Sequence, residues 1–188
     1  MARVSFYPLT WQELHAEIFL LAKKIKATQE KFDRLVAINR GGAVTARILS
    51  DFLKLPTSGF TMVSYGGINE AEEPRVAEGL KVNLAGERIL LIDEIADSGR
   101  TFEVALEYLT QLEAAEIKTL APFIKPKTKF KPDFWQVETA DWVIFPYEVR
   151  ETIEDVQAML RQQGQTELEI EAILDDFGFS AAMLAEFK

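Results

Sequence analysis

The stretch of the chain that decides the fold reads Ile89-Leu90-Leu91-Ile92-Asp93-Glu94-Ile95-Ala96-Asp97-Ser98-Gly99-Arg100-Thr101. Four consecutive apolar residues of this kind predict a short strand that is buried on both faces. Two acidic residues follow at the end of the strand, and a Ser-Gly-Arg-Thr turn then leads into a helix expected over residues 102–112. We therefore expect a strand–loop–helix unit of a parallel sheet, with its loop at the carboxyl edge.

The loop of this unit combines groups that attract an anion with groups that repel one. Backbone N–H groups at the start of a helix attract anions, and Ser98 and Thr101 add hydroxyl donors. Gly99 lets a ligand approach the backbone closely. The carboxylates of Asp93 and Glu94 would repel a phosphate, but they can hold sugar hydroxyls or a bound cation. A sugar phosphate satisfies both halves of the loop.

Other segments extend the same alternation of strands and helices. Apolar runs predict strands at residues 35–38, 60–64, 120–124 and 142–145, and helical spacing predicts helices after Thr10 and through residues 44–52. Residues 65–86 contain four glycines and little periodicity, so we expect them to be mobile and partly exposed. The whole pattern predicts an α/β fold: a mainly parallel sheet flanked by helices, with a small hood and a helical C-terminal extension.

The character of the sequence changes after about residue 150. Helices are expected over residues 151–163, from a capping box at Thr166 to about residue 177, and over residues 180–187. We therefore predict one domain over residues 1–150 and a helical extension over residues 151–188. The tripeptide Asp176-Phe177-Gly178 matches a kinase signature, but the other kinase motifs do not accompany it, and we interpret it as coincidence.

Composition excludes several classes of function. The 188 residues include no cysteine and one histidine, so disulfides, thiolate metal sites and histidine-rich metal sites are excluded, and acid–base chemistry must rest on carboxylates, lysines or tyrosines. The net charge of −9 argues against a nucleic-acid partner. The sequence shows no signal peptide and no apolar stretch of membrane-spanning length. These features predict a cytoplasmic protein with no membrane partner.

Residues 89–101 resemble, at all thirteen positions, the motif with which the type I phosphoribosyltransferase family binds 5-phosphoribosyl-1-pyrophosphate (PRPP). The resemblance implies that Asp93 and Glu94 hold the ribose hydroxyls together with Mg²⁺. It implies a 5-phosphate loop formed by Asp97, Ser98, Gly99, Arg100 and Thr101. It also implies that Asp97 manages a proton at N7 of the base; capping the following helix is an alternative role for an Asp here.

A second glycine loop, Arg40-Gly41-Gly42, follows the strand predicted at residues 35–38. Two glycines allow a sharp turn that points N–H groups at an anion, and an arginine adds charge and a forked donor. Alone, the segment would be read as an ordinary tight turn. The family resemblance implies that it is the pyrophosphate loop, often built on a strained or cis peptide. In the same way, Ser64 and Tyr65 resemble the Ser-Tyr pair of the family's lid.

Recognition of the base is assigned to two further segments. A lysine donates to an exocyclic oxygen and disfavours an exocyclic amine, and a tryptophan face offers area for stacking. Lys125 and Trp142 follow in the order and spacing typical of the 6-oxopurine branch, above all of the bacterial xanthine–guanine phosphoribosyltransferases. The resemblance implies that Lys125 contacts O6, Trp142 stacks on the base, Val143 contributes backbone groups, and Glu148 lies near a second metal.

The expected activity is transfer of the phosphoribosyl group of PRPP to guanine, xanthine or hypoxanthine, with Mg²⁺ as cofactor and the protein working as a homo-oligomer, a dimer or tetramer. Two alternatives stay open. The enzyme could use another base, because the PRPP motif does not discriminate between bases. The chain could also be a regulator that senses PRPP or purines without turnover.

Overall fold

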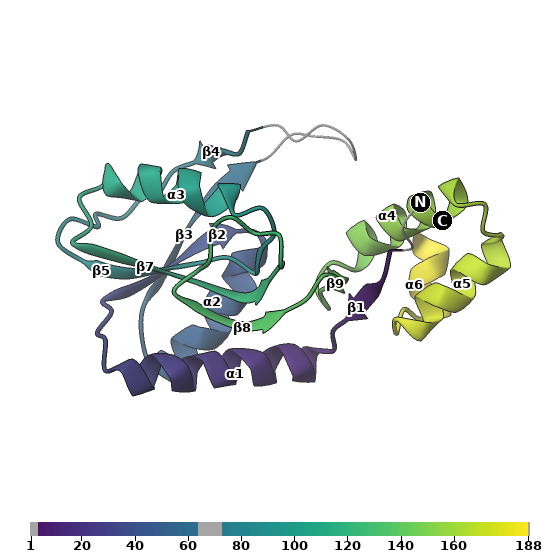
Figure 1. The fold of residues 1–188 in the computed structure, drawn as a ribbon, viewed down its shortest axis with the longest axis horizontal. Helices are drawn as coiled ribbons and strands as arrows, with labels where there is room; N and C mark the ends of the chain where they lie inside the picture. The colour runs from purple at the N-terminus through teal and green to yellow at the C-terminus, as the bar shows by residue number, and fades with distance from the viewer. Residues whose placement is uncertain (1–3, 64–72, 188) are drawn as a thin grey trace. The chain divides into compact units, whose positions relative to one another are not determined.

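The computed structural model describes residues 4–63 and 73–187 (Figure 1). The chain divides into two compact units. Unit 1 consists of residues 1–14 and 141–188, and unit 2 of residues 15–140. The boundary predicted at residue 150 falls within the first turn of α4 (Val149–Gln162), inside unit 1. Within the described residues, no helix has the length and apolar character that crossing a membrane requires.

Unit 2 is built on a seven-stranded sheet within the described residues. In spatial order its strands are β4 (Arg75–Glu78), β3 (Thr57–Val63), β2 (Arg34–Asn39), β5 (Arg88–Ile92), β7 (Glu116–Ile124) and β6 (Ile95–Ala96), while β8 (Phe134–Glu138) also pairs with β7. These neighbours run parallel except for β3 and β4, which are antiparallel. The predicted mainly parallel sheet is therefore confirmed.

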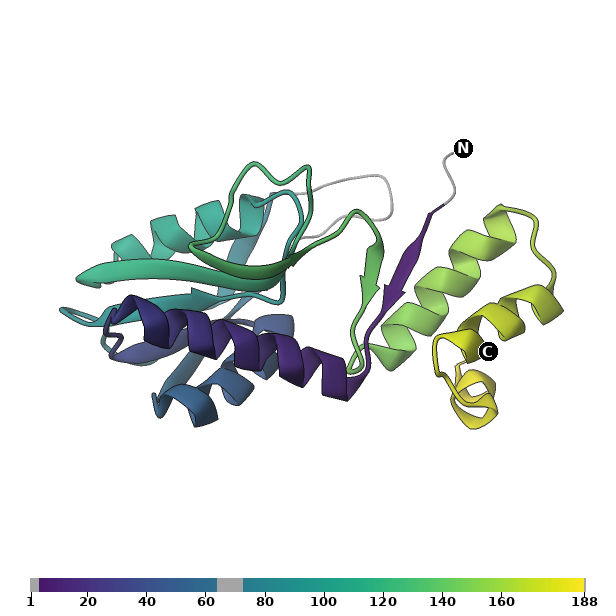
Figure 2. The same cartoon turned by 60° about the horizontal axis from the view of Figure 1, so that its bottom comes forward.

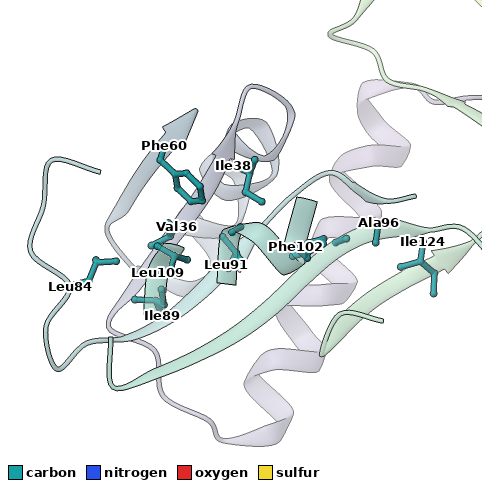
Figure 3. Close-up of a cluster of buried hydrophobic side chains, with 12 residues drawn as sticks. Val36, Ile38, Phe60, Leu84, Ile89, Leu91, Ala96, Phe102, Leu109 and Ile124 are labelled. Carbon is teal, nitrogen blue, oxygen red and sulfur yellow. The ribbon is translucent and has the colours of Figure 1, made fainter. Parts of the chain in front are cut away.

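Helices cover both faces of this sheet. Figure 1 shows α3 (Arg100–Thr110) on one side, and α2 (Gly41–Leu53) with α1 (Trp11–Thr28) on the other. The core under α3 is drawn in Figure 3 and consists of buried residues from several strands, from α3 and from the loop before β5: Val36, Ile38, Phe60, Leu84, Ile89, Leu91, Ala96, Phe102, Ala105, Leu109, Ala121 and Ile124. The alternate residues of β2 and β5 are buried on the opposite face. Burial on both faces explains why these strands are continuous apolar runs.

The sequence predicts an irregular segment over residues 65–86, and this is wrong for Arg75–Glu78, which form β4. This strand lies at the edge of the sheet and reads Arg-Val-Ala-Glu, so it has no apolar run to reveal it. Edge strands commonly carry charged residues, because one side of the strand faces solvent. The strands β1, β6 and β8 are also absent from the prediction. The first two are only three and two residues long.

Unit 1 pairs a short two-stranded sheet with three helices (Figure 2). The strand β1 (Phe6–Pro8) runs parallel to β9 (Trp142–Ile144), and the helices are α4, α5 (Glu167–Asp176) and α6 (Ala181–Glu186). The predicted helical extension is confirmed, including its capping box, in which Thr166 and Glu169 bond each other's backbone N–H groups. The core of the unit is formed by Ile144, Ile153, Val156, Leu160, Ile170, Leu174, Phe179 and Leu184.

Candidate active site

The carboxyl ends of β2 and β5 bring two of the predicted loops together in unit 2. The two strands are parallel neighbours, with Ala37 opposite Ile92. The first strand ends at Asn39 and leads into the glycine loop, while the second ends at Ile92 and is followed by Asp93 and Glu94. Ligands of parallel sheets bind beyond the carboxyl ends of the strands. The loops predicted for pyrophosphate and for ribose therefore lie side by side.

Close packing between these loops depends on glycine. A Cβ atom at Gly41 would lie 2.1 Å from Cδ of Glu94, and one at Gly42 would lie 2.4 Å from the carbonyl oxygen of Ile92. Neither position has room for a larger residue without movement of its neighbour. The peptide bond that precedes Arg40 is cis, as the family resemblance implies for this loop.

A pocket of about 160 Å³ opens between the loops. Its lining comes from both loops, from β3 and from the start of α3: Ile38, Asn39, Arg40, Gly41, Met62, Val63, Pro74, Asp93, Glu94 and Thr101. The carboxylate of Asp93 is buried, and this burial raises the pKa of Asp93 above its ordinary value. The pocket thus combines two carboxylates, a guanidinium and a hydroxyl. Such a set can bind a ligand that carries both hydroxyls and negative charge.

The predicted 5-phosphate loop lies at the start of α3. Gly99 occupies the N-cap position with φ of 89°, so the N-cap residue has no side chain that could cap the helix. The alternative role of Asp97 as a capping residue is therefore not what the structure shows. The hydroxyl oxygen of Ser98 accepts a hydrogen bond from the backbone N–H of Arg100 at 3.3 Å. The loop has the glycine conformation and the hydroxyl donors that the sequence indicated.

The guanidinium of Arg100 is held by two carboxylates. Its nitrogen atoms lie 2.8 Å from the carboxylate of Glu103 and 2.8 Å from that of Glu73. These hydrogen bonds, first to Glu103 and then to Glu73, raise the pKa of Arg100 above its ordinary value. The side chain predicted to contact the 5-phosphate is therefore engaged in this structure with residues of its own chain.

Asp97, the candidate catalytic carboxylate, has a partner that the sequence analysis did not single out. The ammonium group of Lys127 lies 2.8 Å from Oδ1 of Asp97. The loop that carries Lys127 follows β7 and packs on the phosphate loop: the N–H of Lys129 donates to the carbonyl of Ser98 at 3.1 Å. The available signal was weak, namely a second lysine two positions after Lys125.

Lys125, the predicted reader of O6, directly follows the last residue of β7 in unit 2. Its side chain is buried, and its ammonium group donates to the carbonyl of Ala140 at 3.5 Å. A buried lysine that already contacts a carbonyl oxygen is suited to bind a second carbonyl on a ligand. Its position at the carboxyl edge of the sheet is the one expected for a ligand-binding residue.

The other predicted base and metal residues belong to unit 1. Trp142 and Val143 lie in β9, where the side chain of Trp142 is exposed and that of Val143 is buried. Glu148 precedes α4 at its N-cap position. The joint action of these residues with those of unit 2 stays a prediction. The lid residues Ser64 and Tyr65 lie outside the described residues.

The donor set of the pocket is compatible with Mg²⁺. Carboxylate oxygens are the ligands that Mg²⁺ prefers, and the ion usually takes one or two of them together with substrate phosphates and water. Asp93 and Glu94 provide two carboxylates at the pocket. No group of three or more His, Cys, Asp or Glu side chains in the described part of the chain is arranged for a metal. The residues present fit an ion that shares its ligands with a substrate.

Comparisons with known proteins identify relatives of the chain. A model of the phosphoribosyl transferase domain matches residues 9–152. A xanthine-guanine phosphoribosyltransferase of Gluconobacter oxydans is 30% identical over 86% of this chain and 95% of its own length. A purine phosphoribosyltransferase from Pyrococcus horikoshii is 31% identical with a TM-score of 0.68, covering 76% of this chain and 93% of that one. A hypothetical protein from Neisseria gonorrhoeae with bound ppGpp is 27% identical with a TM-score of 0.70, covering 79% and 92%.

Proposed function

The chain belongs to the phosphoribosyltransferase family and has the type I fold, and we propose that it transfers the phosphoribosyl group of PRPP to a 6-oxopurine base. The products would be a purine nucleoside monophosphate and pyrophosphate, the reaction of purine salvage. The xanthine-guanine and purine specificities in the names of two relatives support this class of base. Guanine, xanthine and hypoxanthine are the candidate substrates.

The observation that carries the proposal is the pocket between the loops after β2 and β5. It is lined by Arg40 and Gly41 from one loop, Asp93 and Glu94 from the other, and Thr101 from the start of α3. We assign the ribose hydroxyls to the two carboxylates. We assign pyrophosphate to Arg40 with the backbone of Gly41 and Gly42, and the 5-phosphate to residues 97–101. PRPP carries groups that match each of these parts, and binding at both ends fixes the position of C1.

Mg²⁺ would be held by Asp93 and Glu94, with Glu148 assigned to a second ion. When bound, the ion would neutralise negative charge on the leaving pyrophosphate. The buried position of Asp93 supports this assignment, because a nearby cation would favour the ionised form that burial disfavours.

The reaction breaks the bond between C1 and the pyrophosphate oxygen, and the electron pair leaves with pyrophosphate. A ring nitrogen of the base forms the new bond to C1, and the base loses a proton. We propose that the carboxylate of Asp97 takes up this proton from N7 of the base. The lid residues Ser64 and Tyr65 would exclude water from the reacting carbon, which protects it from hydrolysis.

Selection of the base is assigned to Lys125, Trp142 and Val143. The ammonium group of Lys125 would donate to O6, the indole of Trp142 would stack on the ring, and backbone groups at Val143 would contact the purine edge. An adenine would present an amine to the lysine, and two donors cannot form a hydrogen bond with each other.

The direct test supplies the purified protein with PRPP, Mg²⁺ and one base at a time: guanine, xanthine, hypoxanthine, adenine, orotate or uracil. Formation of nucleoside monophosphate is followed by chromatography. A mock purification from cells that do not express the protein reveals any contaminating enzyme. Turnover confined to 6-oxopurines is the expected result. If only adenine or a pyrimidine were used, the assignment of the base would be wrong, but the assignment of the PRPP site would stand.

A second candidate function is a regulator that binds purine nucleotides without turnover. The observation that favours it is the ppGpp bound to the Neisseria gonorrhoeae neighbour. Calorimetry with PRPP and with ppGpp, in parallel with the turnover assay, separates the two. Tight binding of both without product from any base would favour the regulator.

We further propose that the enzyme works in the cytoplasm as a homo-oligomer, a dimer or tetramer, without a nucleic-acid partner. The net charge of −9 supports the last point, because an acidic surface repels a phosphate backbone. Light scattering on the eluting protein measures the oligomeric state directly, and a monomeric mass would reject that part of the proposal.

A further inference from the structure

The strand that carries Trp142 depends on the N-terminal strand of the chain. Within the described residues, β9 pairs with β1 in parallel, with Phe6 opposite Trp142. The N–H of Trp142 donates to the carbonyl of Ser5 at 2.8 Å, and the N–H of Leu9 donates to the carbonyl of Ile144 at 3.0 Å. A two-stranded sheet is marginally stable by itself, so this pair needs a packed surface behind it.

The helices of the C-terminal extension provide that surface. Ile144 is 3% exposed and belongs to the buried cluster that also contains residues of α4, α5 and α6, while Phe6 packs against the same cluster. Side chains two positions apart on a strand lie on the same face. Trp142 therefore lies on the same face of β9 as Ile144, which packs against the helices. The side chain of Trp142 nevertheless stays 40% exposed. Figure 2 shows the two strands beside these helices.

A chain of aromatic contacts connects the extension with Trp142. The ring centroid of Phe6 lies 5.0 Å from that of Phe177 and 6.5 Å from that of Trp142. Aromatic pairs at such separations contribute to stability beyond the area they bury. Phe6 thus contacts both a ring of the extension and the exposed tryptophan.

The position of Phe177 is fixed by the way α5 ends. Its N–H donates to the carbonyl of Ile173 at 3.2 Å, and the N–H of Gly178 donates to the carbonyl of Asp175 at 2.8 Å. Gly178 has φ of 89°, a backbone conformation that residues with a side chain rarely adopt. The tripeptide that resembles a kinase signature is therefore a helix end that places Phe177 against Phe6.

We propose that Phe6 and Phe177 are positioning residues for Trp142, and that the C-terminal extension determines the affinity for the base through them. The proposal rests on the role of Trp142 as the stacking platform in the proposed function. The proposal assigns a role to residues 153–188, which lie beyond the segment matched by the family model. Loss of a supporting ring would leave the indole less well oriented, so binding of the base would cost more ordering of the platform.

The main experiment compares Phe177→Ala with Leu168→Ala, a matched control whose side chain lies on α5 and is 80% exposed. Phe177→Ala is expected to raise KM for guanine about 3- to 10-fold, the range of one aromatic pair. KM for PRPP should not change, and the control should match the wild type in both. Phe177→Tyr keeps the ring and should restore KM for guanine. Unchanged KM for guanine in Phe177→Ala and Phe6→Ala would overturn the proposal.

A double-mutant cycle shows whether the effect passes through Trp142. In a Trp142→Ala background, Phe177→Ala should raise KM for guanine no further. A full additional increase would mean that Phe177 acts by another route and would reject the positioning role. If Phe177→Ala fails to fold, Phe177→Leu and Phe177→Tyr replace it: both fill the space, but only the tyrosine should keep wild-type KM.

A spectroscopic arm separates this inference from the proposed function. In a Trp11→Phe, Trp135→Phe background, Trp142 is the remaining one of the three tryptophans. Phe177→Ala should increase quenching of its fluorescence by acrylamide, and Leu168→Ala should not. If the wild type forms no nucleotide from any base, the proposed function fails, but this measurement still tests the support of Trp142. Equal quenching in both variants would reject that support even in an active enzyme.

Discussion

The ammonium group of Lys127 lies 2.8 Å from the carboxylate of Asp97, so the candidate catalytic acid–base group is held by a lysine of the neighbouring loop. Both side chains are more than half exposed. The loop itself is fixed on the phosphate loop by the hydrogen bond from Lys129 to Ser98 and by the stacked rings of Phe102 and Phe130, whose centroids are 5.3 Å apart. The pair therefore orients Asp97 from a well-anchored segment.

Replacement of Lys127 by alanine is expected to lower kcat about 3- to 5-fold, because an exposed ion pair contributes at most about 1 kcal/mol. KM for PRPP should change less than kcat, since Lys127 neither lines the pocket between the loops nor belongs to the residues assigned to PRPP. Steady-state kinetics with guanine measure both constants. Lys129→Ala is the matched control, because its ammonium group is not needed for the backbone hydrogen bond to Ser98. An equal loss in both variants would show that the pair with Asp97 is not the cause.

Replacement of Asp97 by asparagine should have a much larger effect. Asparagine keeps the shape but cannot take up the proton of the base, so kcat is expected to fall about 100-fold or more. The dissociation constant of PRPP, measured by calorimetry, should change little. Unchanged turnover would remove Asp97 from the mechanism.

We predict different effects for alanine at the two glycines after Arg40, because an added Cβ atom would meet different neighbours at the two positions. At Gly42 the neighbour is the backbone carbonyl of Ile92, which cannot move without disturbing β5. Gly42→Ala should therefore lower the free energy of unfolding by about 1–3 kcal/mol, the usual cost of overpacking. Urea denaturation of the wild type and the variant measures the difference. A variant as stable as the wild type would show that the loop relaxes easily.

At Gly41 the neighbour is the end of the flexible Glu94 side chain, which can swing away. Gly41→Ala should therefore keep most of the stability while weakening the binding of PRPP, because it displaces a carboxylate from the pocket. Calorimetry with PRPP and Mg²⁺, beside the same urea titration, measures both effects. Wild-type affinity for PRPP in this variant would contradict the role of Glu94.

The central part of the fold was predictable because burial on both faces leaves a local signature. The strands around residues 35–38 and 89–92 are continuous apolar runs, and the glycine and acidic residues that follow them mark the sheet edge. The strand β4 left no such mark, because an edge strand needs no apolar run. The strand β1 is stabilised by β9, which follows 136 positions later, and no local pattern contains that pairing.

The residues of the candidate site also fall into two groups: those within one local segment of the sequence and those that depend on tertiary contacts. The positions of Asp93, Glu94 and residues 97–101 in the fold were predictable because these residues form one local strand–loop–helix unit. The pair between Asp97 and Lys127 joins two loops that are 30 positions apart, and either residue alone reads as an ordinary exposed charge. The positioning role proposed for Phe6 and Phe177 likewise depends on a contact between two segments near the ends of the chain. Tertiary contacts of single residues carry no periodicity, so one sequence could not reveal them.

The buried carboxyl of Asp93 predicts a stability that changes with pH. Its pKa in the folded state is raised above 3.8 by burial, so the folded state binds the proton more tightly than the unfolded state does. Ionisation as the pH rises through the raised pKa therefore destabilises the fold. Asp93→Asn, which stays neutral, should melt at a higher temperature than the wild type at pH 8. The difference should shrink as the pH falls towards 4, and the variant should lose turnover.

Asp33 is the matched control for this titration, because its pKa has shifted in the opposite direction. Hydrogen bonds from Arg88 lower the pKa of Asp33 to about 2. The stability it contributes is present above pH 3.8 and is lost as the pH falls towards 2, so Asp33→Asn should melt at a lower temperature than the wild type at pH 8. Thermal melts across this pH range, without Mg²⁺ and PRPP, compare the two variants. A lower melting temperature for both at pH 8 would contradict the destabilising role assigned to Asp93.

The proposed specificity for 6-oxopurines should depend on the charge of Lys125. Methionine at this position keeps an apolar stem of similar length in a buried site but removes the donor, so the fold should persist while the hydrogen bond to O6 is lost. We expect kcat/KM for guanine to fall about 10- to 100-fold, the range for a hydrogen bond to a charged group. The dissociation constant of PRPP should not change, because PRPP does not carry the carbonyl that Lys125 is proposed to bind. Parallel assays with guanine, hypoxanthine and adenine, together with a thermal melt, separate loss of recognition from loss of folding. If Lys125→Met used guanine as well as the wild type does, base selection would have to be assigned to other residues, and the 6-oxopurine preference would lose its structural basis.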